Sequence, residues 1–395
     1  MGRDLRLPIR KEVLDVRDTV VALRRDFHQF PELSWQEHRT QEKVLAHLTS
    51  LGLDDVRPIA KTGATALVKG SKPGPCVLWR ADMDALPVPE KSKLPYASQN
   101  ESVMHACGHD THMAIALGLA ELFQARRTEL AGSVRFVFQP AEEAAGGAQA
   151  CVADGVLESP RVTTALGLHI SADIPIGMIN VAAGPFFAAP TAFRIVINGR
   201  GGHAAAPHQS VDAVVVAAHA IVALQTVVSR SIAPSETGVL TVGKVTSGFR
   251  GNVIAESATL SGTIRSYTQL VRETMVARTE EVLTGVCAAF GAEFTFEHNT
   301  SCPPLVNDPQ VTEFVRKEAL NYFGPNMIVA APTMGAEDMS VFLEERPGCY
   351  FWLGARNESK GIAGRHHDPA FVIDEDALPI GLEFGSRLIE TRLSG

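Results

Sequence analysis

The chain has 395 residues, of which 45% are hydrophobic and 20% are charged, so it is a folded globular protein rather than a disordered one. One hydrophobic core rarely organises a chain of this length, and we therefore expect two compact domains. The formal net charge of -8, without a run of Lys and Arg, argues against binding to nucleic acid or to an anionic membrane and favours small-molecule chemistry.

The sequence gives no sign of export. The opening residues Met1-Gly-Arg-Asp-Leu-Arg6 lack the apolar core of a secretory signal, and the most apolar window, 213–228, is interrupted by His219 and Gln225. The cysteines at positions 76, 107, 151, 287, 302 and 349 do not form a disulfide framework. We therefore expect reduced thiols and a cytoplasmic protein.

The first part of the chain alternates between strands and helices. Periodicity predicts helices over 13–27, 44–51 and 113–123, and apolar runs predict strands over 64–68, 76–79, 134–138 and 165–168. This order is typical of a mostly parallel sheet covered on both faces. Three predicted strands lead into polar residues, namely Asp82 with Asp84, Glu142 with Glu143, and His169. Ligands bind at the carboxyl ends of such strands, so we expect these residues to converge.

Between about residues 186 and 300 the pattern changes. Strands over 193–197, 238–245, 253–264 and 293–296 and helices over 211–228 and 270–290 follow a βαββαβ order, that of the split ferredoxin-like unit. A helix over 310–322, a strand over 349–353 and a helix over 375–393 come afterwards. We predict one discontinuous domain, 1–185 and 301–395, interrupted by an inserted α+β domain, 186–300.

The side chains that could carry chemistry are those that bind first-row divalent ions. Glu142 and Glu143 are adjacent, Cys107 and His109 lie in a Cys-Gly-His-Asp sequence, and His169 and His367 stand apart from them. A second carboxylate beside a ligating one is what activation of a metal-bound water requires. The sequence therefore outlines the site of a metal-dependent hydrolase.

Over nearly its whole length, the chain resembles the metal-dependent aminoacylase and carboxypeptidase amidohydrolases, in the branch of hippurate hydrolases, N-acyl-amino-acid amidohydrolases and auxin-conjugate hydrolases. The motifs that carry the resemblance are, in order, Arg25-Asp-Phe-His28-Gln-Phe-Pro31-Glu32-Leu, Lys61-Thr-Gly63, Arg80-Ala-Asp82-Met-Asp84-Ala-Leu-Pro87, Met104-His-Ala-Cys107-Gly-His109-Asp110, Phe138-Gln-Pro-Ala-Glu142-Glu143, Gly199-Arg-Gly-Gly-His203, Asn252-Val-Ile, Gly335-Ala-Glu337-Asp338 and His366-His367. Each motif is weak alone, but the ordered set makes a chance match improbable.

The resemblance implies a zinc-peptidase-like catalytic domain with an inserted lid and dimerisation domain. It implies two divalent ions with one bridging ligand, Glu142 as general acid/base, and the metal ligands Cys107, His109, Glu143, His169 and His367. The wider superfamily has a ligand His at the position of Asp82, and Cys107 would supply the compensating donor. Zinc, manganese, cobalt and nickel all tolerate such mixed ligands.

The implied reaction is hydrolysis of the amide bond of an N-acyl amino acid of the hippurate or N-acetyl type. His203 would reach in from the partner subunit of a homodimer, or of a tetramer, to the developing oxyanion. Asn252 and Arg265 would hold the carboxylate of the substrate, because an Arg fork binds carboxylate bidentately. The family commonly has Asp where this chain has Thr191, after the hinge 185–190.

Other interpretations remain open from the sequence alone. Cys107 could be a nucleophile with His109 or His112 as its base, in a metal-free hydrolase that resists chelators and is inactivated by alkylation. A non-catalytic binding protein that retains the fold is a second alternative. Individually, Cys107 could be a buried small hydrophobe, His169 a core histidine, His367 a surface residue and Arg265 a partner in a cross-strand salt bridge.

Overall fold

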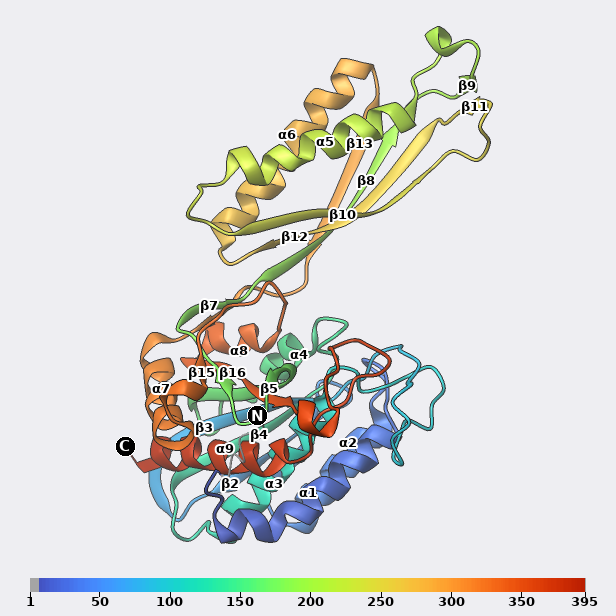
Figure 1. Cartoon of the computed structure of the whole chain (residues 1–395). Helices are drawn as coiled ribbons and strands as arrows, with labels where there is room; N and C mark the ends of the chain where they lie inside the picture. Colours follow the sequence, from blue (N-terminus) through green and yellow to red (C-terminus); the bar gives the residue numbers. More distant parts are fainter. Residues whose placement is uncertain (1–6, 395) are drawn as a thin grey trace. The chain divides into compact units, whose positions relative to one another are not determined.

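The computed structural model describes residues 7–394, so the prediction for the opening six residues lies outside it. The chain divides into two compact units (Figure 1). Unit 1 comprises the described residues up to Gly184, Val306–Pro332 and those from Asp338 onward, whereas unit 2 comprises Pro185–Leu305 and Thr333–Glu337. The inserted unit thus ends a little later than residue 300 and includes a short segment from the outer part of the sequence.

Unit 1 is built on an eight-stranded sheet with the order β1-β2-β4-β3-β5-β16-β6-β15. The strands are β1 (Asp54–Ile59), β2 (Gly63–Lys69), β3 (Lys72–Asp82), β4 (Ala131–Gln139), β5 (Val162–Pro175), β6 (Ile179–Asn180), β15 (Ile328–Val329) and β16 (Gly348–Arg356). In the centre of this sheet, strands β4, β3, β5 and β16 run parallel to one another. The predicted mostly parallel central sheet is confirmed.

Helices cover both faces of this sheet (Figure 1). The larger layer contains α1 (Lys11–Gln29), α2 (His38–Ser50), α3 (His109–Ala125), α7 (Pro309–Phe323) and α9 (Ala377–Ser394), and the smaller contains α4 (Gly147–Ala153) and α8 (Met339–Glu345). The main hydrophobic core lies between the sheet and the larger layer, and α3 is buried along nearly its whole length. The sequence pattern did not predict α4 and α8, because helices this short do not develop a clear period.

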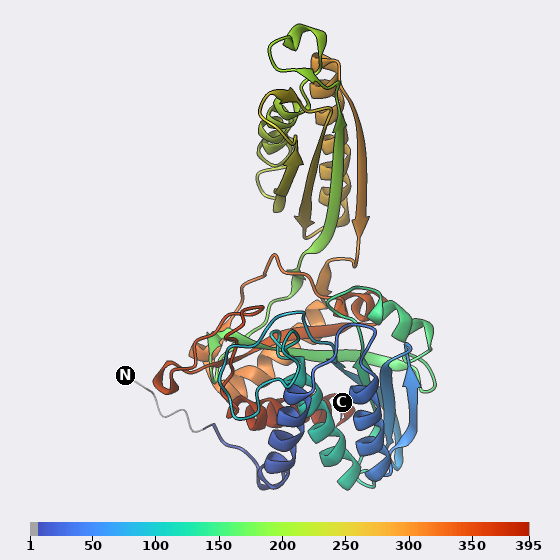
Figure 2. The same cartoon turned by 90° about the vertical axis from the view of Figure 1, so that its right-hand side faces the viewer.

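Unit 2 has a four-stranded antiparallel sheet with the order β10-β12-β8-β13. Its elements are β8 (Ala189–Asn198), α5 (Ala213–Ser231), β10 (Gly238–Ser247), β12 (Ser257–Ser266), α6 (Gln269–Phe290) and β13 (Glu293–Thr300). Both helices pack on one face of the sheet (Figure 2). This arrangement is the predicted ferredoxin-like unit.

One predicted strand of unit 2 was wrong. The run 253–264 forms two strands, β11 (Val253–Ile254) and β12, and β11 pairs with β9 (Gly202–His203) in a separate ribbon. Between them, the carbonyl of Ala255 accepts from the N–H of Ala213, and that of Glu256 accepts from the N–H of Gly199. These bonds to the chain before α5 interrupt the ladder, which apolar patterning alone could not reveal.

The remaining elements are short. They are β7 (Gly184–Phe187), β14 (Leu305–Asn307) and the 3-10 helices η1 (Pro207–Gln209), η2 (Pro325–Met327) and η3 (Glu358–Lys360). By length and composition alone, α5 is the single described helix that could cross a membrane, but its buried side belongs to the core of unit 2. All six cysteines are free and buried.

Candidate metal centre

Strand register brings three parts of the predicted site to the same level of the sheet. Asp82, the last residue of β3, lies opposite Gln139, the last residue of β4. Arg80 lies opposite Gly167 of β5, which places His169, two residues further along β5, level with Asp82. The loops that follow these parallel strands therefore meet at one edge of the sheet.

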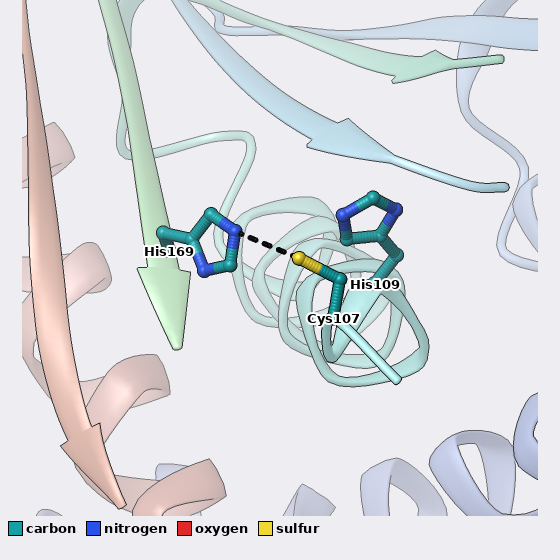
Figure 3. Close-up of side chains that lie close together, drawn as sticks. All are labelled: Cys107, His109 and His169. Carbon is teal, nitrogen blue, oxygen red and sulfur yellow. Dashed lines mark hydrogen bonds between the residues drawn. The ribbon is translucent and has the colours of Figure 1, made fainter. Parts of the chain in front are cut away.

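Cys107 and His109 flank a glycine that the local geometry requires. Gly108 has a φ of 92° and immediately precedes α3. A Cβ at this position would lie 2.3 Å from Cγ2 of Ile170, so a larger residue would push the turn away from β5. The glycine thus allows Cys107 to approach His169, whose Nε2 lies 3.5 Å from the Cys107 Sγ (Figure 3).

Backbone hydrogen bonds determine which ring nitrogen each buried histidine presents to the cluster. Nδ1 of His109 donates to the carbonyl oxygen of Asp84 at 2.9 Å, and Nδ1 of His169 donates to that of Ile170 at 2.7 Å. When each ring is neutral, its Nε2 therefore carries the lone pair. Nε2 of His109 is buried and has no hydrogen-bond partner among the described residues. A metal ion would satisfy such an acceptor.

The backbone of the glutamate pair is held by Asp84. Its Oδ1 accepts the N–H of Glu142 and its Oδ2 accepts the N–H of Glu143, both at 3.0 Å. Oε1 of Glu143 is buried and lies 3.3 Å from Nε2 of His367, yet it forms no hydrogen bond within the described part of the chain. The carboxylate of Glu143 therefore has an oxygen available to a cation.

His367 reaches this cluster from a distant part of the sequence. Its backbone has a φ of 62°, and its N–H donates to the carbonyl of Ala106 at 2.8 Å. This bond ties the segment to the residue directly before Cys107. Its side chain is 54% exposed, so His367 forms the solvent side of the cluster.

The five predicted ligands fall into two of the donor groups in the described part of the chain, and these two groups share one residue. One group is Cys107, His109 and His169, and the other is Cys107, Glu143 and His367. Glu142 groups with His109 and Glu143, and within each group the ligand atoms lie within 4.8 Å of one another. A thiolate common to both groups can bridge two ions, and mixed nitrogen, oxygen and sulfur donors suit zinc and its neighbours.

Buried carboxylates give the cluster a negative potential. Burial alone would lower the pKa of His109, but Asp82 and Asp84 outweigh burial and raise this pKa to about 10. Burial, together with the charges of Glu143 and Glu142, raises the pKa of the Cys107 thiol well above its ordinary value. Without a metal the site therefore binds protons, which a divalent cation can replace.

The model of peptidase family M20/M25/M40 matches residues 78–391, which include every residue of these donor groups. The chain belongs to this family. The resemblance to aminoacylases and carboxypeptidases is therefore confirmed, and the protein is a metallo-amidohydrolase, an enzyme that acts on amide bonds.

Individual M20 relatives match along most of the chain. It is 40% identical to N-acetyl-L-cysteine deacetylase of Bacillus subtilis, over 91% of this chain and 84% of the relative. It is 38% identical to an IAA-amino acid hydrolase of Arabidopsis thaliana, over 93% of this chain and 83% of the relative. The solved structure of a Bacillus subtilis dinuclear metal binding peptidase from the M20 family has a TM-score of 0.82 at 33% identity, covering 96% of this chain and 99% of its own.

Unit 2 contains the predicted oxyanion donor His203 and the predicted substrate residues Asn252 and Arg265, and two of these three are close together. His203 on β9 is exposed, pairs with Val253 of β11, and accepts the N–H of Ala205 through Nδ1 at 3.0 Å. The carbonyl of Asn252 accepts the N–H of Ala204. His203 and Asn252 therefore share the small ribbon at the end of the sheet where β12 begins (Figure 1).

Arg265 lies at the opposite end of β12, paired with Pro190 of β8. Eight residues of strand separate it from Ser257, a distance of about 26 Å. Burial lowers the pKa of Arg265, and its Nη1 has no hydrogen-bond partner among the described residues. The other interpretation of Arg265, a cross-strand salt bridge, is therefore not supported within the described residues. Its guanidinium keeps an N–H donor that a ligand could use.

Two further histidines, neither of them a predicted ligand, contact the site. Nδ1 of His112 donates to Asp82 at 2.6 Å, and Nε2 accepts the N–H of Ile170, so both ring nitrogens are occupied. Nε2 of His366 accepts the N–H of Ala172 at 3.3 Å, which leaves Nδ1 to donate toward Cys107 Sγ, 3.9 Å away. The adjacent pair His366-His367 was the sequence signal that could have indicated that His366 contacts Cys107.

The contact between Cys107 and His169 also resembles a thiol–imidazole nucleophile pair. Reactive cysteines, however, have a lowered pKa and partial exposure, whereas Cys107 is buried and its pKa is raised. Glu143 and Glu142, whose charges help to raise the pKa of Cys107, are carboxylates of the kind expected around a bound cation. The geometry therefore favours Cys107 as a metal ligand.

Proposed function

We propose that this M20 enzyme hydrolyses the amide bond of N-acyl amino acids at a two-metal centre and releases a carboxylic acid and a free amino acid. The observation that carries the proposal is the pair of donor groups sharing Cys107. Relatives named for N-acetyl-cysteine deacetylation and for hydrolysis of IAA-amino acids support an acyl amino acid as the substrate.

The proposed ligands divide between the two ions. Cys107, His109 and His169 would hold one, and Cys107, Glu143 and His367 the other, with zinc, manganese, cobalt or nickel as the metal. Bound there, the ions would polarise the substrate carbonyl and acidify a water molecule. Glu142 is within reach of the same groups, so its carboxylate would take the proton of that water and pass it to the leaving amine nitrogen.

We propose that the working enzyme is a homodimer. The spacing within unit 2 supports this. Arg265 lies about 26 Å along β12 from Ser257, and the β9–β11 ribbon of His203 and Asn252 adjoins the Ser257 end, so these residues of one chain cannot contact one small substrate. In a dimer, Arg265 of one chain would bind the substrate carboxylate at one site, and His203 and Asn252 of that chain would serve the other site. The exposed apolar side chains Val214, Val215 and Val222 on α5 are further support for association through unit 2.

A substrate panel tests the proposal. The purified enzyme would be assayed on N-acetyl, N-benzoyl and indole-acyl amino acids and on their carboxamides, with the metal content measured. We expect cleavage of the free-carboxylate compounds, loss of activity in chelator and recovery with added ions. Equal cleavage of the carboxamides would remove Arg265 and Asn252 from substrate binding. Activity that survives chelation but not thiol alkylation would instead indicate Cys107 as a nucleophile.

A further inference from the structure

The segment that carries Glu142 and Glu143 has a backbone shape that its own residues do not favour. Ala141 has a φ of 52° and Ala145 a φ of 65°, left-handed values that cost an L residue free energy. Gly147 packs so closely that a Cβ there would lie 1.7 Å from the carbonyl oxygen of Pro140. Contacts from outside the segment must therefore hold this turn.

Two buried carboxylates supply those contacts. Asp84 accepts the N–H groups of Glu142 and Glu143, as described above. Oε1 of Glu37 accepts the N–H of Ala141 at 2.9 Å, in a fully buried hydrogen bond. Three consecutive amides are thus held by two side chains from different parts of unit 1, and the backbone of Glu142 is fixed from both sides.

The side chain of Glu37 binds the N–H of Ala141 and does not cap the helix that follows it. It occupies the N-cap position of α2 but makes no side-chain capping bond, and Glu is not a preferred N-cap residue. Its side chain is fully buried, and Oε2 accepts the hydroxyl of Thr62 at 2.6 Å. The turn after Thr62 also packs on the glutamate segment, because a Cβ at Gly63 would lie 2.6 Å from Cδ of Pro140.

We infer that Glu37 is a positioning residue for hydrolysis: its carboxylate holds the left-handed Ala141 and so aims the carboxylate of Glu142 at the reacting atoms. The inference rests on the proposed function, because it takes Glu142 as the group that moves the proton. Glu37 belongs to none of the donor groups in the described part of the chain, and it acts through the backbone of Ala141. Its loss should therefore lower kcat without changing metal content or KM.

The test compares Glu37→Ala and Glu37→Gln with Glu32→Ala as a matched control. Glu32 precedes the same helix, but its carboxylate accepts from the N–H groups of Arg39 and Thr40 and from the Thr40 hydroxyl. We expect Glu37→Ala to lower kcat by about 10- to 100-fold, the cost of a small misplacement of a catalytic group. KM should stay within about threefold, and both ions should remain bound. Gln retains an oxygen for the Ala141 N–H, so Glu37→Gln should restore kcat to within about threefold of wild type.

Several results would overturn the inference. These are a wild-type kcat in Glu37→Ala, an equal loss of kcat in Glu32→Ala, or loss of metal from Glu37→Ala, which would make Glu37 part of the integrity of the metal site. If Glu37→Ala does not fold, Glu37→Asp serves instead, because the shorter side chain withdraws the acceptor while keeping the charge, and a wild-type kcat in that variant would also overturn it. Glu142→Gln separates this test from the proposed function, since an active Glu142→Gln enzyme would refute the role of Glu142 whatever Glu37 does.

Discussion

At the scale of single residues, Asp84 connects both halves of the candidate centre. Its carbonyl oxygen orients His109, and its carboxylate holds the backbone of Glu142 and Glu143 and accepts the Ser34 hydroxyl at 2.6 Å. Loss of a group that orients metal ligands in this way typically costs about 10- to 100-fold in metal affinity. A mutation of Asp84 therefore tests the metal centre, although Asp84 is not itself a proposed ligand.

Replacing Asp84 with Asn should weaken metal binding. An Asn amide has one acceptor oxygen, so its nitrogen would face one of the two backbone N–H groups and push the glutamate segment away. We expect metal affinity to fall by about 10- to 100-fold in a competition titration against a coloured chelator. Ser34→Ala removes only a hydroxyl from Asp84 and should change affinity little. Equal affinities for wild type and Asp84→Asn would contradict this role.

Metal binding should depend on pH, because the empty site holds protons. The pKa of His109 is raised to about 10 and that of Cys107 is also raised, so at pH 7 both carry a proton that an ion must displace. Affinity should therefore rise with pH between 6 and 8, by up to about tenfold per pH unit for each proton released. Calorimetry in buffers of different ionisation enthalpy measures the protons released. A binding enthalpy that is independent of the buffer would show that none is released.

At the scale of elements, a buried ion pair ties α1 to the start of α3. Nε of Arg24 donates to Oδ2 of Asp110 at 2.9 Å, and Nδ1 of His28 lies 2.8 Å from the same oxygen. Arg24, His28 and Asp110 are all fully buried. Asp110 directly follows His109, so α1 fixes the position of the helix end that presents the ligand.

Breaking this pair should destabilise unit 1 in a pH-dependent way. Burial would raise the pKa of Asp110, but Arg24 and His28 outweigh it and hold that pKa well below its usual range. A carboxyl with a depressed pKa stabilises the fold above its unfolded pKa of about 3.9, and that stabilisation is lost as pH falls below this value. Asp110→Asn should lower the free energy of unfolding at pH 7 by about 1.5 to 3 kcal/mol, because it removes one of the two carboxylates, Asp110 and Glu375, that pair with the buried Arg24.

Urea denaturation of the chelator-treated protein at pH 7, 5 and 4 measures this effect. Burial would lower the pKa of His28, but Asp110 and Glu90 outweigh burial and raise it, so the difference between wild type and Asp110→Asn should grow from pH 7 to pH 5 as His28 takes up a proton. It should begin to narrow near pH 4, where Asp110 is protonated in the unfolded chain. Asp15→Asn is the control, because Asp15 pairs with Lys11 on the exposed surface of α1 and should contribute little. A difference that widened between pH 5 and pH 4 would contradict the assignment.

At the scale of the whole molecule, the proposed dimer divides the work of one site between two chains. Unit 1 of one subunit would supply Glu142 and the ligands, and unit 2 of the other would supply His203. A subunit with a defective Glu142 can then still serve its partner. A site shared between two subunits and a site completed within one chain therefore predict different activities for mixed dimers.

Mixing two inactive variants tests the division. Glu142→Gln and His203→Ala should each lose at least about 100-fold in kcat as homodimers. After unfolding and refolding together in equal amounts, half of the dimers are mixed, and each mixed dimer has one intact site, so about 25% of wild-type activity should return. Refolding each variant alone is the control. No recovery from a mixture that contains mixed dimers would place His203 in the site of its own subunit.

The sequence by itself determined the layered α/β architecture and the inserted ferredoxin-like unit, because both are encoded in the local periods of apolar residues. It also indicated which side chains could bind metal, since Cys107, Glu143 and the candidate histidines stand after predicted strands or beside distinctive neighbours. It did not resolve the break between β11 and β12, which depends on hydrogen bonds to a segment more than forty residues earlier in the chain.

Only the tertiary structure decided how these side chains combine. The sharing of Cys107 between two groups, the buried Nε2 of His109, the clamp that Glu37 and Asp84 form on the glutamate segment, and the distance between Arg265 and His203 all depend on elements far apart in the sequence. A linear pattern records which groups are present. Their distances, lone-pair directions and burial arise only when the strands pair and the helices pack, because those contacts are non-local.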